Sequence, residues 1–118
     1  MIINYHGRKF TGISNAAHGQ VSGDTVFHYS QHDFILTATY NGGDIHEGYL
    51  LGRVNQDSSL DFAYHHLDIH GKLKSGYCHS IPELLQDGRI RLHESWYWTY
   101  GGDGKGESVI EEILNQKK

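Results

Sequence analysis

The sequence predicts an all-β protein, a single antiparallel up-and-down β-barrel of about eight strands. Three observations lead to this prediction. Apolar and polar residues alternate with a period of two, glycine-bearing turns interrupt the alternation at short intervals, and helix signals are scarce. Because links of hairpin length force sequential strands to pair, the strands can close on themselves and leave no exposed edge.

The composition limits the chain to one domain, residues 1–118, with one modest core. Ten Lys and Arg residues against fourteen Asp and Glu residues give a net charge of -4, so we expect no nucleic-acid partner. No apolar run is long enough to span a membrane, and the first residues lack the features of a secretory signal, which predicts a cytoplasmic protein. A lone Cys78 excludes an intramolecular disulfide.

Short β-rich runs fill the first half of the chain. Turns are expected at residues 6–8, 14–20 and 31–33 and at Gly42-Gly43, a pair that suits a two-residue hairpin because glycine tolerates positive φ. The strands expected around these turns are Ile2–Tyr5, Lys9–Ile13, Thr25–Ser30, Phe34–Tyr40 and Ile45–Val54.

Turns continue at similar spacing in the second half, at residues 55–59, at His70-Gly71 and at 82–88, where Pro82 begins a longer connection. The glycine-rich segment 101–106 is expected to be a flexible loop at one barrel end, since it lacks the strand and helix context of a phosphate-binding loop. The strands expected here are Leu60–Asp68, Lys72–Ile81 and Arg89–Thr99.

The tail, residues 107–114, fits either a helix or a strand. Its apolar residues Val109, Ile110, Ile113 and Leu114 form a helical stripe as well as they form a strand with a polar end. We favour a strand, because it would return beside residues 96–99 and then pair with the first strands, which closes the sheet.

Inward-facing rows are read from alternate positions, because residues two apart on a strand share a face. On strand 89–99 this row includes Glu94, Trp96 and Trp98, which would provide the apolar walls and the hydrogen-bonding anchor of a cavity for an amphiphilic molecule. The rows expected to face inward are Ile90, Leu92, Glu94, Trp96 and Trp98; Leu60, Phe62, Tyr64, His66 and Asp68; and Phe34, Leu36, Ala38 and Tyr40, with Phe27 and Tyr29 extending the lining.

Our first functional interpretation is a binding module that holds an amphiphilic small molecule inside the barrel. The residues expected to bind this ligand are Trp96, Trp98, Glu94, Tyr64, His66, Phe62, Tyr40 and Tyr29. A second interpretation is a small enzyme that uses Glu94 for acid/base chemistry with Tyr64 or His66, and with His79 or Tyr40 as further candidates.

A third interpretation is a filled barrel in which the tryptophans are core residues and Glu94 sits at the rim. Its outer face, with Tyr49, Tyr97 and several histidines, would then mediate self-association into a homo-oligomer or contact with another protein. Ligand-dependent tryptophan fluorescence separates this interpretation from the first.

We expect neither a metal nor a cofactor. His65 and His66 are neighbours on a strand and point to opposite faces, while Tyr64, His66 and Asp68 share a face but would need ligands from other strands. Cys78 has no second cysteine and is expected to be a small buried residue.

Several segments carry a family resemblance over nearly the whole chain: residues 25–29, 36–43, 64–66, 89–98 and 108–112. In these segments the chain resembles a family of short bacterial proteins often labelled N-acetylglutamate synthase. Acetyltransferases of that kind bind acetyl-coenzyme A on a mixed α/β fold, which this helix-poor sequence does not predict, so we do not expect that activity and assign no catalytic residue from it. The strand order resembles that of avidin-like and lipocalin-like barrels, which implies architecture and not function.

Overall fold

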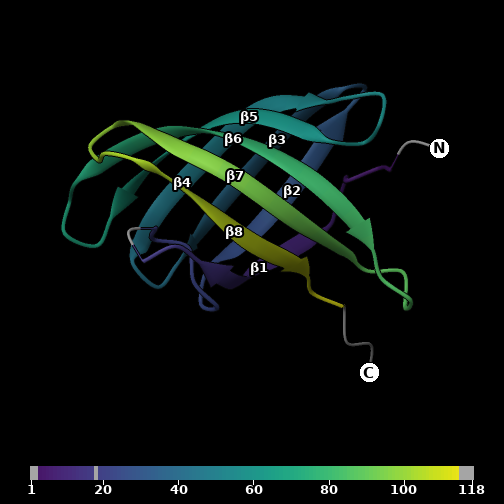
Figure 1. The fold of residues 1–118 in the computed structure, drawn as a ribbon, viewed down its shortest axis with the longest axis horizontal. Coiled ribbons are helices and arrows are strands. Elements are labelled where there is room, and N and C mark those ends of the chain that lie inside the picture. The colour runs from purple at the N-terminus through teal and green to yellow at the C-terminus, as the bar shows by residue number, and fades with distance from the viewer. Residues whose placement is uncertain (1–2, 18, 115–118) are drawn as a thin grey trace.

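The structure is a computed structural model that describes residues 3–17 and 19–114, and these form a closed barrel of eight antiparallel strands (Figure 1). Each strand pairs with the next one in sequence, and the last strand returns to pair with the first, as predicted. The described residues contain no helix that could span a membrane. The strands are β1 (Lys9–Asn15), β2 (Val26–His32), β3 (Ile35–Gly42), β4 (Ile45–Val54), β5 (Leu60–Asp68), β6 (Leu73–Leu84), β7 (Ile90–Tyr100) and β8 (Lys105–Glu112).

Alternation along β5 and β7 separates the inside of the barrel from the outside. Glu94 and Trp96 on β7 are buried, whereas their neighbours Ser95 and Tyr97 face solvent. On β5, Phe62 and His66 are buried in the same way. The inward rows predicted for these two strands are therefore confirmed.

One end of the barrel is filled. Residues 3–8 cross this end beside the β4–β5 turn, and the Tyr5 side chain there is 0 % exposed. Its hydroxyl donates a hydrogen bond to the Ser58 carbonyl at 2.6 Å. Phe10 packs on Tyr29 with ring centroids 4.7 Å apart. Each large apolar side chain buried here contributes about 1.5–3 kcal/mol, so this end carries much of the fold's stability.

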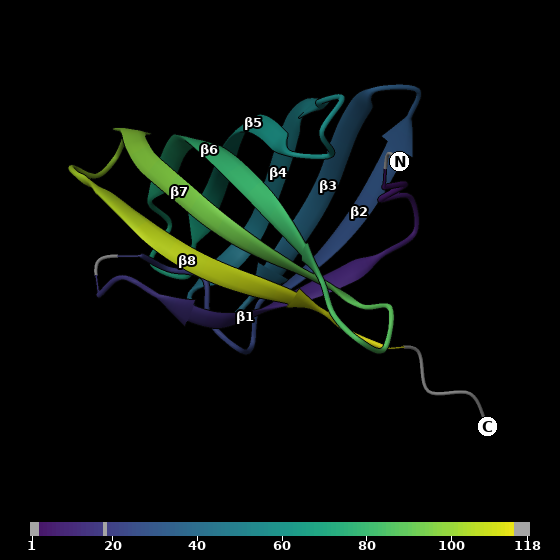
Figure 2. The ribbon, with the colours of Figure 1, turned by 45° about the vertical axis from the view of Figure 1, so that its right-hand side comes forward.

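The opposite end is covered in part by the described residues of the β1–β2 loop, 16–17 and 19–25 (Figure 2). The Asn15 side chain holds this loop, because its amide nitrogen donates to the Val21 carbonyl at 3.1 Å and its amide oxygen accepts from the Ala16 N–H at 2.8 Å. Gly12 lets the loop lie against β1, since a Cβ at that position would collide with the Ser22 carbonyl. The fold thereby brings Gln20 and Val21 over the barrel mouth.

The strand predicted over Ile2–Tyr5 is wrong for its described residues, 3–5, which form the plug; Ile2 lies outside the described residues. The turn predicted at 31–33 is also displaced, because β2 continues through His32 and the turn residues are Asp33 and Phe34. Phe34 therefore sits at the tip of a hairpin with 64 % of its surface exposed, and its predicted inward position is wrong.

The hairpin predicted at Gly42-Gly43 is present, but its two turn residues lie one position later in the sequence. Gly42 pairs with Ile45, so the two turn residues are Gly43 and Asp44. A Cβ on Gly42, whose φ is +116°, would collide with the Asp24 carbonyl. Loop packing against this position accounts for the glycine there.

Pro82 does not end its strand as predicted, because β6 continues to Leu84 and Pro82 lies opposite Leu92 of β7. Pairing with β5 ends at Ser80, so beyond that residue β6 has an unpaired edge that tolerates a residue without an N–H. The strand predicted over residues 107–114 is confirmed for 107–112, and residues 113–114 lie beyond its end. It begins earlier than expected, at Lys105, which shortens the glycine-rich loop to residues 101–104.

Candidate functional site

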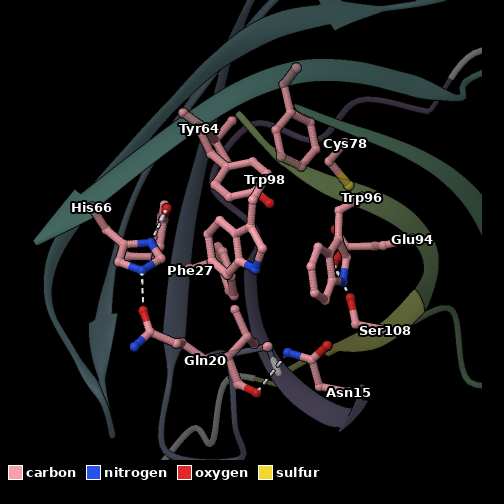
Figure 3. A pocket seen from close by; sticks show the side chains of 15 residues that line it. Asn15, Gln20, Phe27, Tyr64, His66, Cys78, Glu94, Trp96, Trp98 and Ser108 are labelled. Atoms are coloured by element: carbon pink, nitrogen blue, oxygen red, sulfur yellow. Dashed lines mark hydrogen bonds between the residues drawn. The ribbon is translucent and has the colours of Figure 1, made fainter. Parts of the chain in front are cut away.

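The half of the barrel beneath the β1–β2 loop contains a cavity (Figure 3). Its volume, taken as the space open to the centre of a water-sized sphere, is about 40 Å³. By the same measure one ordered water needs roughly 10–15 Å³. The space therefore suits a small molecule or the narrow end of a larger one. Aromatic rings and a few polar groups line it: Asn15, Gly19, Gln20, Val21, Phe27, Tyr40, Leu50, Phe62, Tyr64, His66, Cys78, Glu94, Trp96, Trp98 and Ser108.

The aromatic walls are held by contacts between the rings. Trp98 meets Trp96 with centroids 5.4 Å apart at 60°, and it meets Tyr64 at 5.9 Å and 65°. Such edge-to-face pairs add about 0.5–1.5 kcal/mol beyond the area they bury. Across the cavity Phe27 and Tyr40 stack at 4.8 Å. These contacts fix the shape of the walls.

His66 belongs to a chain of hydrogen bonds that runs from the cavity to its rim. Asp68 accepts bonds from the backbone N–H groups of Lys72 and His70, and the Lys72 donor, followed by the Gln20 amide, lowers its pKa to about 2. Because an ionised carboxylate only accepts, the Gln20 amide nitrogen donates to it at 3.1 Å and the Gln20 oxygen faces His66.

The Gln20 oxygen fixes the tautomer of the neighbouring histidine. His66 donates from Nε2 to this oxygen at 2.7 Å, which leaves Nδ1 to accept the Tyr40 hydroxyl at 2.9 Å. Burial, and secondarily the charge of Lys74, lowers the pKa of His66 to about 4. The imidazole is therefore neutral at pH 7, in agreement with its hydrogen bonds.

Glu94 lies on the β7 row between the filled end and the aromatic walls. Its two carboxyl oxygens accept hydrogen bonds from Ser80 Oγ at 3.1 Å and from Ser108 Oγ at 3.0 Å. Burial raises the pKa of Glu94 to about 7, against the opposing effect of the hydroxyl and thiol donors. This carboxyl can therefore gain or lose a proton near neutral pH.

Two further titratable groups lie close to Glu94. The Cys78 thiol lines the cavity, and burial raises its pKa well above the usual value, so it is a neutral thiol. Tyr29 is buried beyond the cavity lining, and its hydroxyl has no hydrogen-bond partner among the described residues. Burial also raises the pKa of Tyr29, with the nearby Glu94 as the second cause.

The structure brings together most of the predicted site residues. Of the eight residues predicted to bind a ligand, Tyr29 does not line the cavity and the other seven do: Trp96, Trp98, Glu94, Tyr64, His66, Phe62 and Tyr40. His79 does not join Glu94, because its side chain faces outward and bonds Asp61 at 2.7 Å. Sequence reasoning missed Gln20 and Asn15, whose positions depend on how the β1–β2 loop folds back.

The described residues hold no cluster of three or more His, Cys, Asp or Glu side chains suited to a metal ion. Asp68 shares a face with Tyr64 and His66, but its carboxylate is used to hold the β5–β6 turn and Gln20.

A closed antiparallel barrel with one filled end and one hollow, aromatic-lined end has the architecture of barrels that hold a small ligand. The chain belongs to the avidin-like protein family, whose family model matches residues 3–113. This match confirms the avidin-like architecture expected from the strand order. No curated protein and no solved structure gives a significant match to the chain.

Proposed function

We propose that this barrel binds a small amphiphilic molecule in the cavity lined by Trp96, Trp98 and Tyr64. One observation carries the proposal: the cavity beneath the β1–β2 loop combines aromatic walls with a buried carboxyl, Glu94. Apolar walls with a few placed polar groups are the usual composition of a small-molecule site.

Binding explains the polar groups better than a filled core does. A buried carboxyl costs stability even when it is hydrogen-bonded, and the filled end, around Phe10 and Leu92, is built from apolar side chains. A ligand that contacts Glu94 would offset that cost. Gln20 lies at the mouth, so a ligand would enter beside it.

The geometry favours binding over the acid/base enzyme. Glu94 bonds Ser80 and Ser108, whereas His66 bonds Tyr40 and Gln20, so the two groups belong to separate networks. A general acid/base pair would need both within reach of one reacting atom.

The test is native mass spectrometry of the purified protein, followed by tryptophan-fluorescence titration with 1-butanol, n-butylamine and butyrate as small amphiphilic probes. Leu50→Phe fills the cavity, and the outward Leu51→Phe is its matched control. We expect a retained mass or a saturable fluorescence change in the wild type and in Leu51→Phe that is lost in Leu50→Phe. Identical behaviour of all three proteins, with no bound mass and no saturation, would overturn the proposal.

As a second candidate function, we propose self-association through the outer face of β4–β7. Leu51 of β4 and Tyr97 of β7 are 62 % and 48 % exposed, and they lie in one cross-strand row with Ala63 and Tyr77. An exposed apolar row of this kind favours a protein contact. Light scattering should show a dimer or larger assembly that Tyr97→Glu dissociates and that Tyr100→Glu, beyond this row, does not; a monomer at all concentrations would contradict the proposal.

A further inference from the structure

We infer that the ligand enters with a cationic head, the ammonium group of a short alkylamine, and that this head binds against Glu94. This inference rests on the proposed binding function and names the ligand's chemical class.

The first support is the charge of the barrel interior. Glu94 is buried, and the buried polar residues of the described chain include no lysine or arginine. Ser80 and Ser108 satisfy the carboxyl oxygens with neutral hydroxyl donors, which leave the negative charge of the ionised form uncompensated. A ligand cation in the cavity would supply the missing charge.

The second support is the aromatic wall beside this carboxyl. Figure 3 shows Glu94 and Ser108 next to Trp96, with Trp98 and Tyr64 on the other side of that ring. Ring faces attract cations, most strongly in tryptophan. Trp98 already shows this attraction, because Lys74 Nζ lies 5.3 Å from its ring centroid.

Lys74 and Glu94 lie at different levels of the barrel. Lys74 contacts Trp98, which lies four residues beyond Glu94 toward the mouth end of β7, about 13 Å along the strand at 3.3 Å per residue. The Lys74 ammonium is held at that ring, whereas the Glu94 carboxyl is bonded by Ser80 and Ser108. Lys74 therefore marks the rim, and Glu94 marks the inner end of the cavity.

The size of the cavity selects a narrow head. About 40 Å³ for the centre of a water-sized sphere admits an ammonium group and its first methylene groups. The remainder of a longer amphiphile would extend past Gln20 toward solvent.

Among the described residues that line this cavity, Glu94 is the group whose charge changes near neutral pH. The described titratable groups that face it are Cys78 on β6, Tyr29 on β2, Tyr40 on β3 and Tyr64 on β5, and burial raises the pKa of each, so all stay neutral. His66 is neutral above a pKa of about 4. An alkylamine stays protonated throughout, so the pH dependence of its binding reports on Glu94.

The test compares n-butylamine with 1-butanol and butyrate, probes of similar length that are cationic, neutral and anionic, by tryptophan-fluorescence titration at about pH 8 and about pH 5.5. We expect n-butylamine to bind about tenfold or more tightly than 1-butanol at the higher pH, and to lose about tenfold or more in affinity at the lower pH, because protons then compete for Glu94. 1-Butanol should change little between the two conditions.

Glu94→Gln should remove both the preference for n-butylamine and its pH dependence while leaving 1-butanol binding intact. Glu107→Gln is the matched control, since Glu107 is an exposed carboxylate beside Ser108 on β8, and it should behave as the wild type. Circular-dichroism melting checks that both variants fold. If Glu94→Gln does not fold, the pH dependence of n-butylamine binding to the wild type still tests the inference.

Two failures can be told apart. Binding of 1-butanol or butyrate as tight as that of n-butylamine, at both pH values, would overturn the cationic head and leave the binding function standing. Absence of saturable binding by all three probes to the wild type would overturn the binding function and this inference with it.

Discussion

Glu94 and His66 line the same cavity with pKa values displaced in opposite directions. Burial raises the pKa of Glu94 to about 7, and burial together with Lys74 lowers that of His66 to about 4. The shared cause is desolvation, which disfavours the charged form of each group. Between these two pKa values both side chains are mainly neutral, so the ligand-free cavity is close to uncharged in mild acid.

This relationship predicts two opposing slopes of stability against pH. The unfolded protein protonates His66 near 6.5, so the contribution of His66 is present above that pH and is lost as the pH falls toward 4. The folded protein keeps the Glu94 proton to a higher pH, so the contribution of Glu94 is present below about 4.5 and is lost as the pH rises toward 7. Each slope spans about 2–3 kcal/mol and offsets the other in the wild type.

Urea unfolding from pH 4 to pH 7 would resolve the two slopes through single variants. Glu94→Gln should leave the His66 slope, so that stability rises with pH, and His66→Gln should leave the Glu94 slope, so that stability falls with pH. Parallel curves for both variants and the wild type would show that neither group titrates in the folded protein as described.

The hydrogen bond from Tyr40 to His66 predicts a stability cost for its removal. Tyr40→Phe keeps the ring that stacks on Phe27 but leaves the buried Nδ1 of His66 without its donor. We expect a loss of about 1–3 kcal/mol by urea unfolding. Tyr49→Phe is the control: its hydroxyl bonds Glu47 on the exposed surface, and its loss should cost no more than about 0.5 kcal/mol.

The inward and outward faces of β7 predict unequal costs at neighbouring positions. Trp96 is 7 % exposed, and Trp96→Ala should cost about 3–5 kcal/mol. Tyr97 points outward against Tyr77, and Tyr97→Ala should cost about 1 kcal/mol or less. Denaturant unfolding measures both, and equal losses would mean that the cavity is lined by other residues.

The local pattern was sufficient to predict where Glu94 and Trp96 point. Alternation within one strand determines which side chains share a face without any knowledge of the rest of the fold. The inward-facing residues of β5 and β7 were therefore predicted correctly. The same rule failed for Phe34, because its row was extended one residue into a turn, where side chains no longer alternate. The position of this turn depends on how β2 and β3 pair, because hairpin register is fixed by the turn type and loop length together.

The mouth and the plug could not be predicted from local pattern. Gln20 reaches His66 because the β1–β2 loop folds back onto Gly12. The alternation of apolar and polar residues does not predict this contact, because the loop is not a strand. Tyr5 fills the closed end because its hydroxyl reaches the Ser58 carbonyl, 53 positions away in the sequence. Both arrangements are set by tertiary contacts. The prediction of a strand over Ile2–Tyr5 used only the local sequence pattern, which does not contain those contacts.

The close approach of the Tyr40 ring to the Gly48 backbone predicts that a side chain at position 48 would disturb the cavity. A Cβ at Gly48 would lie 2.5 Å from the Tyr40 ring, so Gly48→Ala must displace that ring, which bonds His66 and stacks on Phe27. We expect Gly48→Ala to cost about 1–3 kcal/mol of stability by urea unfolding and to weaken probe binding in the cavity. Gly23→Ala is the control, because the nearest atom to its Cβ would be 3.7 Å away, in ordinary contact. Losses of similar size in both variants would indicate that glycine flexibility, and not the space beside Tyr40, determines the effect.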